Sequence, residues 1–493
     1  MHFLFLFCFF SRGHVATSLL GTRALAEEAT YICWGAAILA CLPTTAAAAR
    51  TSVLSSRWRG LWKCVPALSF HVEPKAPPGA FSSTANAVDA ALDAYSDSAA
   101  LNRLALDVEP STPVPRIAHW LRFASLRHAG ELRLSLSGAG GGAGARGIST
   151  GHNIRRRLIK LPIYQRATGI ELARINFQLR LPSAGVFTSL RALRINGGKL
   201  HGDVGHLVST QCPRLRELEM SNVGVVVASG QISISSTSLQ RLVFRHMSGI
   251  SKKARIVVAA PSLYYLALEN CGDRSAAATI VAPMLAELIW NHSYDPSRHS
   301  IRDADRQIYR LAVTCRSNTA LFQRFDAVDE MSLHLSMLPG VQGYKKFVED
   351  MEELTRTKVL EVKGLSTKQH LGPAMLHLLK KFTGLTKFKI DLLPVNTWQS
   401  LCGHDCKCLE PGSWRTDSVT LDSLEELEIS SFTGAEDDTE FLKLLFGCKI
   451  KLRRMAIHTR KDVSLSQEVQ KHLWGLARPH CIILEFETMQ FHR

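Results

Sequence analysis

Four potential metal ligands lie close together in the C-terminal part of the sequence: Cys402, His404, Cys406 and Cys408. Thiolate and imidazole groups are ligands that zinc prefers, so the cluster has the chemistry of a zinc site. Zinc sites built from cysteine pairs usually have two residues between the members of a pair, and this segment lacks that spacing. We therefore interpret the segment as a loop with reduced, packed thiols, and we predict no metal ion and no cofactor.

Two further patterns resemble sites that carry out chemistry. Gly142-x-Gly144-x-x-Gly147 has the spacing of a dinucleotide-binding loop, but a polar segment follows it where an apolar helix is required. The acidic run 436–438 precedes an apolar helix-like run, where carboxylates oppose the helix dipole. The sequence contains no His-Glu-x-x-His motif, Walker loop or nucleophile elbow. It therefore predicts no catalytic residue and a binding protein that is not an enzyme.

The composition is that of a chain with a sizeable core, since 46% of its 493 residues are hydrophobic. The net charge is +16 and uneven, because residues 101–200 hold sixteen basic and four acidic side chains, whereas residues 401–450 hold four and eleven. We interpret these charges as solvated faces, with an acidic protein or nucleic acid along the basic segment as the alternative. Twelve scattered cysteines in a chain of this size indicate reduced thiols inside the cell.

The first fifty residues contain two apolar stretches. Met1–Phe10 has no basic residue ahead of it and so lacks the charged start of a secretory signal. Tyr31–Ala49 is free of charge over nineteen residues, which approaches the length of a membrane span. Pro43 and the alanine-rich composition argue against insertion. We predict no membrane partner, and a membrane-anchored receptor stays open as an alternative.

A short pattern, Leu-x-x-Leu-x-Leu with substitutions, recurs along the chain. The first five units begin 25, 24, 24 and 22 residues apart, within the period of leucine-rich repeats. The eight units begin at Leu190, Leu215, Leu239, Leu263, Leu285, Leu385, Leu424 and Leu452. The last two apolar residues of each unit are two apart, which places both on one face of a short strand. One such strand cannot bury its apolar face alone, so we predict an α/β leucine-rich-repeat solenoid (horseshoe).

Details of the repeat predict where the array begins, how its strands end and what they expose. The alternating segment Leu132–Leu136 is expected to begin the array. Leu263–Cys271 has the form Leu-x-x-Leu-x-Leu-x-x-Cys, whose thiol turns the chain after the strand. Residues that flank the middle leucine point away from the core, and we expect target contacts there without being able to name the target. They are Arg194, Glu217, Glu219, Arg241, Ala267 and Glu287.

The segment Ile38–Trp62 has a helical pattern. Pro43 ends one helical stretch, and Thr44 or Thr45 can cap the next. Five apolar residues then follow at helical spacing, which predicts one amphipathic stripe. They are Val53, Leu54, Trp58, Leu61 and Trp62. Such a helix either packs on its own domain or docks on a partner, and the pattern leaves both interpretations open.

The same segment resembles the second half of the F-box of plant F-box/leucine-rich-repeat proteins. The likeness lies in Arg50–Arg59, which reads Arg-Thr-Ser-Val-Leu-Ser-Ser-Arg-Trp-Arg, and in Leu61-Trp62 and Val65-Pro66-Ala67-Leu68. Further along, Leu424–Ile429 and Phe441–Phe446 resemble the FBD-like terminal region of grass proteins. The resemblance covers about residues 38–486.

This resemblance implies a substrate receptor of a Skp–cullin–F-box ubiquitin ligase, located in the nucleus and/or the cytoplasm. Its partners would be the Skp adaptor, cullin through that adaptor, and an unknown protein target, with neither nucleic acid nor membrane. The implied adaptor-binding residues are Leu42, Pro43, Val53, Leu54, Trp58, Leu61 and Trp62.

The chain departs from the family at the start of the F-box. The family begins with a Leu-Pro-Asp-type sequence, whereas Thr30–Gly35 reads Thr-Tyr-Ile-Cys-Trp-Gly. A mispredicted first exon would explain this, and so would a degenerate F-box on a repeat scaffold that joins no ligase. We divide the chain into an atypical segment 1–35, a partial F-box 36–75, a helical linker 76–137, a Gly-rich basic loop 138–160, leucine-rich repeats 161–400 and an FBD-like region 401–493.

Overall fold

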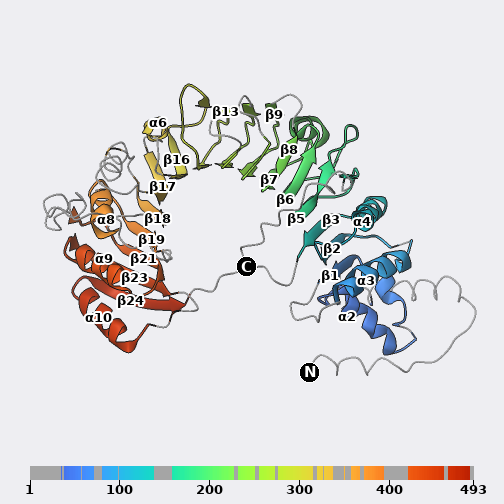
Figure 1. The fold of residues 1–493 in the computed structure, drawn as a ribbon, viewed down its shortest axis with the longest axis horizontal. Helices are drawn as coiled ribbons and strands as arrows, with labels where there is room; N and C mark the ends of the chain where they lie inside the picture. Colours follow the sequence, from blue (N-terminus) through green and yellow to red (C-terminus); the bar gives the residue numbers. More distant parts are fainter. Residues whose placement is uncertain are drawn as a thin grey trace, which may run out of the picture. The chain divides into compact units, whose positions relative to one another are not determined.

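The computed structural model describes residues 35, 38–56, 58–71, 80–97, 99–137, 158–226, 231–249, 255–271, 276–314, 319–325, 327–336, 349, 357–366, 371–382, 384–392, 420–459, 463 and 465–488. Residues 30–34, the Gly-rich segment 142–147 and the cysteine-rich segment 402–408 lie outside this set. The chain forms two compact units, Met1–Ile148 and Ser149–Arg493 (Figure 1). We describe each unit by itself and call them unit 1 and unit 2.

In its described residues, unit 1 combines three parallel strands with three α-helices. The strands are β1 (Ala67–Phe70), β2 (Arg103–Val108) and β3 (Glu131–Leu136), and the helices are α2 (Thr45–Arg50), α3 (Ala80–Ala94) and α4 (Val114–Leu126). Their register aligns Leu68 with Leu104 and Leu104 with Leu132. All three leucines are buried, because alternation along a strand sends every second side chain into the core.

The prediction that the ladder of strands begins at Leu132–Leu136 is wrong, because β1 and β2 come before β3 in the same parallel arrangement. The leucines aligned in β1 and β2 are 36 residues apart, since α3 lies between these strands. That separation exceeds the period of a leucine-rich repeat, so a search by period misses it.

Helices α3 and α4 are joined by a polar network around a buried tryptophan. The Trp120 side chain is fully buried, and its indole N–H donates to Asp89 Oδ1 at 2.6 Å. Arg116 donates to the other oxygen of Asp89 at 2.7 Å. The carboxylate thus satisfies two donors at once, which removes the cost of enclosing them.

The helix predicted to run through residues 45–62 is only partly present. Thr44 caps α2, with its side chain accepting from the Ala47 N–H at 3.1 Å, as the sequence predicted. Beyond α2 the chain forms two short 3₁₀ helices, η2 (Thr51–Val53) and η3 (Leu61–Cys64). Gly60 stands before η3 with a φ of 94°, a left-handed conformation that no continuous helix contains. The single amphipathic stripe is therefore wrong.

Unit 2 is built mainly from parallel strands. Its larger sheet contains β4 (Leu158–Lys160), β5 (Gly169–Arg180), β6 (Ala192–His201), β7 (Glu217–Ser221), β8 (Gly224–Val226), β10 (Arg241–Arg245), β12 (Tyr265–Glu269), β14 (Glu287–Trp290), β16 (Gln307–Thr314), β17 (Ala327–Ser336), β18 (Val359–Ser366), β19 (Lys387–Asp391), β21 (Glu426–Phe432), β23 (Leu452–Thr459) and β24 (Cys481–Thr488). Residues 158–160 form a strand, so the predicted loop 138–160 is wrong at its C-terminal end.

Two smaller sheets and a few helices complete unit 2. A four-stranded sheet contains β9 (Gln231–Ser235), β11 (Arg255–Ala259), β13 (Ala277–Val281) and β15 (His299–Arg302), and a two-stranded sheet contains β20 (Thr420–Leu421) and β22 (Lys449–Ile450). The helices are α5 (Val204–His206), the π-helix Leu207–Gln211, α6 (Thr319–Arg324), α8 (Leu371–Leu379), α9 (Glu436–Phe446) and α10 (Gln467–Ala477). The described residues form a mixed α/β structure with parallel strands and no closed barrel.

The register of the larger sheet aligns the repeat positions that the sequence identified. Leu193 pairs with Leu218, Leu218 with Leu242, and Leu242 with Leu266. The predicted strands of these units are therefore confirmed, and their aligned leucines are buried. The same row continues through the less regular middle of the chain, as Leu288, Leu311, Met331, Leu360, Phe388, Leu427, Met455 and Leu484.

A repeated backbone arrangement fixes this register. The carbonyl just before several of the strands accepts two N–H groups from the next unit: Arg216 O accepts from Gln240 at 2.8 Å and from Arg241 at 2.9 Å. Gln240 O does the same for Tyr264 and Tyr265. The thiol of Cys271 turns the chain after β12 as predicted, donating to Phe244 O at 3.1 Å. None of the described helices is long and apolar enough to cross a membrane.

Candidate functional site

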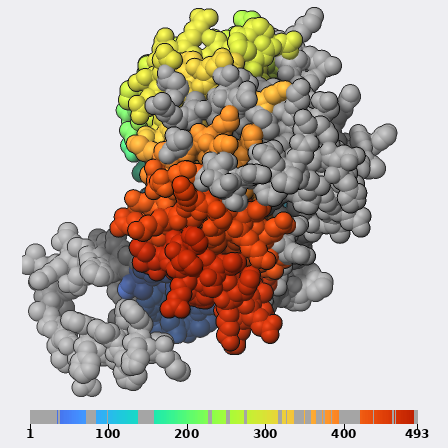
Figure 2. Space-filling view, turned by 90° about the vertical axis from the view of Figure 1, so that its left-hand side faces the viewer, coloured from blue at the N-terminus to red at the C-terminus, as the bar shows by residue number. Residues whose placement is uncertain are grey.

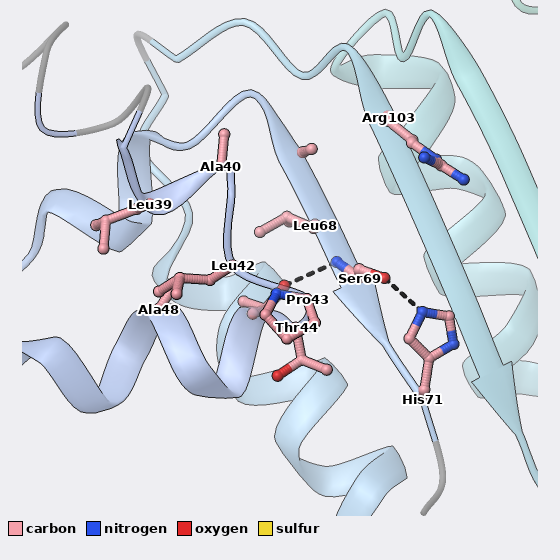
Figure 3. A pocket seen from close by; sticks show the side chains of 12 residues that line it. Leu39, Ala40, Leu42, Pro43, Thr44, Ala48, Leu68, Ser69, His71 and Arg103 are labelled. Carbon is pink, nitrogen blue, oxygen red and sulfur yellow. Dashed lines mark hydrogen bonds between the residues drawn. The ribbon is translucent and has the colours of Figure 1, made fainter. Parts of the chain in front are cut away.

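Unit 1 contains a cavity of about 230 Å³ beside the outer edge of β1 (Figure 3). Its walls come from the segment between residues 39 and 48, from β1 and from the start of β2. The lining residues are Leu39, Ala40, Leu42, Pro43, Thr44, Thr45, Ala48, Ala67, Leu68, Ser69, His71 and Arg103. The cavity thus includes Leu42 and Pro43, two of the residues expected to bind the adaptor.

Two hydrogen bonds hold the cavity wall in place. Ser69 donates its backbone N–H to Thr45 Oγ1 at 2.8 Å, which fastens the first turn of α2 to the edge of β1. The Ser69 hydroxyl and His71 Nε2 are 2.7 Å apart (Figure 3). Thr45 is buried, so this contact between helix and strand is shielded from water. The edge of β1 therefore has one of its N–H groups already satisfied within unit 1.

The seven residues expected to bind the adaptor divide by exposure. Val53 and Leu54 are 87% and 65% exposed, while Leu42 and Pro43 are also exposed. Leu61 is buried, and a Cβ added to Gly35 would lie 2.8 Å from its Cδ1. Leu61 therefore packs within its own unit, and its place in the adaptor-binding set stays a prediction.

The remaining residues of this segment are intermediate. Trp58 and Trp62 are half-buried, so each has part of its ring available. Ile38, at the start of the same segment, is 38% exposed, and the sequence did not single it out. Exposed aliphatic side chains are informative when several occur in one short segment, as they do here.

Unit 2 presents side chains on the face of the larger sheet that is opposite the leucine row. We call these side chains the outward rows. They lie one residue before, one residue after and three residues after the aligned leucine, because successive side chains of a strand alternate between faces. Arg194, Glu217, Glu219, Arg241, Ala267 and Glu287 all belong to these rows, on neighbouring strands from β6 to β14.

Ion pairs run across the strands in the first part of the outward rows. Arg194 contacts Glu217 at 2.5 Å, and Arg245 bridges Glu219 at 3.0 Å and Glu269 at 2.6 Å. Opposite charges on adjacent strands are close enough to attract each other, because strands are about 4.8 Å apart. These pairs orient the side chains, although pairs this exposed contribute little to stability.

An apolar cluster interrupts the charges. Val243, Tyr265 and Ala267 form it, with Ile289 packed against them, and Val243 and Ala267 are fully buried. The guanidinium of Arg241 lies 3.6 Å from the centre of the Tyr265 ring, the geometry of a cation–π contact. Sequence analysis identified only Ala267 of this cluster, although the residues between the leucines of successive units are apolar at these positions.

The C-terminal part of the outward rows is also charged. Lys387 contacts Glu426 at 2.7 Å, and its hydrogen bond lowers the pKa of that carboxyl below the ordinary value. Arg454 contacts Glu485 at 2.5 Å. His458 lies 3.4 Å from Glu487. These groups suit recognition of another macromolecule, since charged and aromatic side chains on a rigid sheet make specific contacts.

The described residues hold no group of three or more His, Cys, Asp or Glu side chains that could bind a metal ion. The cysteine cluster at 402–408 is outside that search. What the described part offers is therefore two kinds of contact surface, an exposed apolar segment in unit 1 and the outward rows in unit 2.

No family model matches the chain. The chain is similar to an FBD-associated F-box protein of Arabidopsis thaliana, with 26% identity over 221 residues, or 44% of this chain. The match spans about half of the length of that relative, 48%. Together with the mixed α/β structure of parallel strands, this distant similarity supports the interpretation of the chain as a plant protein of the F-box/FBD type.

Proposed function

We propose that this chain is the target-recognition subunit of a Skp–cullin–F-box ubiquitin ligase. In this proposal the segment 38–62 docks on the Skp adaptor, and unit 2, as a leucine-rich-repeat solenoid, holds a protein target on its outward rows. The observation that carries the proposal is the exposure of Val53 and Leu54 in a segment that resembles an F-box. The distant F-box relative supports it.

The proposed mechanism is proximity. A receptor that binds both the adaptor and a target raises the effective concentration of the target's lysines near a separate conjugating enzyme. No side chain of this chain needs to take part in bond making, so the proposal assigns it no catalytic residue, metal or cofactor. Its place of action would be the nucleus and/or the cytoplasm.

The repeat architecture in the proposal rests on register. Among the described strands of the larger sheet, thirteen consecutive parallel pairings from β4 to β24 follow the order of the chain once the short β8 is set aside. Each strand therefore contacts mainly its neighbours in sequence, the arrangement that defines a solenoid. A surface that continues over many strands can contact a target at several points, as a receptor requires.

Binding of the Skp adaptor tests the proposal. The full chain is immobilised, purified adaptor is titrated, and the Val53→Asp/Leu54→Asp double variant is compared with the unsubstituted chain. Because both side chains are exposed, the free energy of unfolding should change by less than about 0.5 kcal/mol. The loss of two apolar contacts should weaken binding of the adaptor by at least about tenfold. Val226→Asp, at an exposed position of unit 2, is the matched control. Equal retention of the adaptor by the double variant would contradict the proposal.

A second candidate is a repeat protein that binds a partner but joins no ligase. The observation in its favour is the break at Gly60, which replaces a continuous helix by two short 3₁₀ helices. It predicts that the unsubstituted chain retains no adaptor, whereas a version given a Leu-Pro-containing F-box start retains it. The same titration therefore separates the two candidates.

A further inference from the structure

The last strand of unit 2 has an open edge. In the described part of the chain, β24 pairs only with β23, and its eight residues give it a long free side. Figure 2 shows residues of this C-terminal end, in red, on the face turned toward the viewer. An open edge offers unpaired backbone groups to another strand, and proteins usually cover or charge such edges. At β1, by contrast, Thr45 satisfies an edge N–H.

Apolar side chains accompany this edge. Ile482 and Ile483 of β24 are 73% and 49% exposed, and Trp474 of the adjacent α10 is 48% exposed. An edge strand with large apolar side chains on it and next to it suits pairing with another chain, because pairing buries both the backbone groups and the side chains.

We propose that β24 pairs with β24 of a second copy of this chain, antiparallel and about a two-fold axis at Leu484. By alternation along the strand, Ile482, Leu484 and Phe486 share the face of β24 on which the leucine row lies, and Leu484 is the buried one of the three. Under this symmetry Ile482 meets Phe486 of the other copy, and Leu484 meets its own counterpart. The apolar row is thus complementary to itself, the requirement for an isologous interface.

Several positions of the two-fold axis place the leucine rows of both copies on the same side of the joined sheet. Repulsion between acidic side chains favours the axis at Leu484 among them. An axis at Glu485 would place two identical carboxylates directly opposite each other, which is unfavourable. With the axis at Leu484, Glu485 lies opposite Ile483 and stays paired with Arg454 of its own chain at 2.5 Å. Glu487 then lies opposite Cys481. An axis at Ile483 also separates the acids, but it pairs only five residues, 481–485, instead of seven.

The size of the interface sets its strength. Stable interfaces bury about 800 Å² per partner, and a paired seven-residue strand with a half-exposed tryptophan offers less than that. The dimer should therefore dissociate in the micromolar range, as small interfaces do.

Sedimentation velocity of the full chain, from about 1 to about 100 µM, tests association. The expected result is a shift with concentration from the 54.5 kDa monomer toward twice that mass. Ile482→Lys should raise the dissociation constant by at least about tenfold, because it places a charge in the apolar row. Met284→Lys changes a side chain of similar exposure far from β24 in the sequence, and it should have no effect. A monomer at every concentration, or equal association by the Ile482→Lys variant, would overturn the proposal.

Disulfide trapping tests the register. Ile483→Cys and Glu485→Cys chains are mixed, oxidised and digested, and the linked peptides are identified by mass spectrometry. Directly opposite residues of antiparallel strands lie close enough for a disulfide, whereas diagonal ones are about 7 Å apart or more. The yield of the disulfide between position 483 of one variant and position 485 of the other should be well above the yields of the 483–483 and 485–485 disulfides. Disulfides that involve the native Cys481 are recognised by their mass. Predominant 483–483 or 485–485 links would overturn the axis at Leu484.

Discussion

Two histidines of unit 2, His292 and His299, are built into hydrogen bonds that need neutral rings. His292 Nε2 accepts from the Cys271 N–H at 3.0 Å, and His299 Nδ1 accepts from the Asp295 N–H at 2.9 Å. A protonated ring has no acceptor nitrogen, so protonation would break both contacts. Burial lowers the pKa of His292 to about 4 and also lowers that of His299.

These shifts predict a loss of stability in mild acid. The folded pKa of His292 lies below the unfolded value of 6.5, so between these pH values the unfolded chain binds more protons. The unfolding free energy of unit 2 should therefore fall as pH drops from 6.5 to 4, by about 3 kcal/mol from His292 alone. Urea titrations at several pH values measure this loss.

The His292→Asn variant isolates this effect from the titration of carboxylates. It should be less stable at pH 7.5, because packing is lost, but its stability should depend less steeply on pH between 6.5 and 4. An unchanged slope in the variant would show that His292 does not cause the acid sensitivity.

At the level of strands, one aligned position of β6, β7, β10 and β12, at or just beyond the strand's paired part, holds a left-handed residue. In four successive units this position holds Gly197, Asn222, His246 and Asn270, with φ values of 88°, 56°, 49° and 50°. Glycine and asparagine tolerate this conformation, whereas histidine pays a steric cost for it. His246 is therefore the least suitable residue in an otherwise consistent row.

Replacement of His246 should stabilise unit 2. His246→Asn or His246→Gly is expected to raise the unfolding free energy by about 0.5–1 kcal/mol, since the strain of a left-handed side chain is relieved. Asn222→Ala is the matched opposite change and should lower it by a similar amount. Thermal and urea denaturation measure both, and a loss of stability in His246→Asn would contradict the strain argument.

The spacing of leucines predicted the strands that belong to evenly spaced repeat units. In these units the repeat period and the alternation of side chains together determine which face is buried. It missed β9, β11, β13 and β15, whose strands are rich in Ser, Ala and Thr. Their apolar pairs Ile232/Ile234 and Ile256/Val258 recur 24 residues apart, so the signal was present but weak. Strands β1 and β2 were missed because the intervening helices hide the period.

In the segment 38–62, the spacing of apolar residues does not determine which of them are exposed. Val53 and Leu61 are both apolar and eight residues apart, which suits one helical face. The left-handed Gly60 separates them, so Val53 is exposed and Leu61 is buried. The left-handed conformation of one glycine thus separates an exposed from a buried residue, and a pattern of residue types does not contain that information.

The whole chain should unfold in two steps, because each compact unit has its own buried core. Leu104 of unit 1 and Leu266 of unit 2 are both fully buried. Leu104→Ala and Leu266→Ala should each cost about 2–5 kcal/mol and move only the transition of their own unit. Urea denaturation followed by circular dichroism resolves the two steps. A single transition that both substitutions shift equally would show that the chain unfolds as one cooperative body.

The carbonyls that accept two N–H groups before several of the strands affect how such a chain can change over evolutionary time. Neighbouring repeat units are joined by local backbone hydrogen bonds, as the carbonyl of Arg216 is to the N–H of Arg241 in the next unit. Duplication of a segment of about 24 residues adds one complete repeat unit and widens the sheet by one strand, about 4.8 Å. Insertion of one residue inside a strand instead turns its leucines to water. The larger sheet can therefore grow or shrink by whole repeat units, while the alternation of buried and exposed side chains within each strand is preserved.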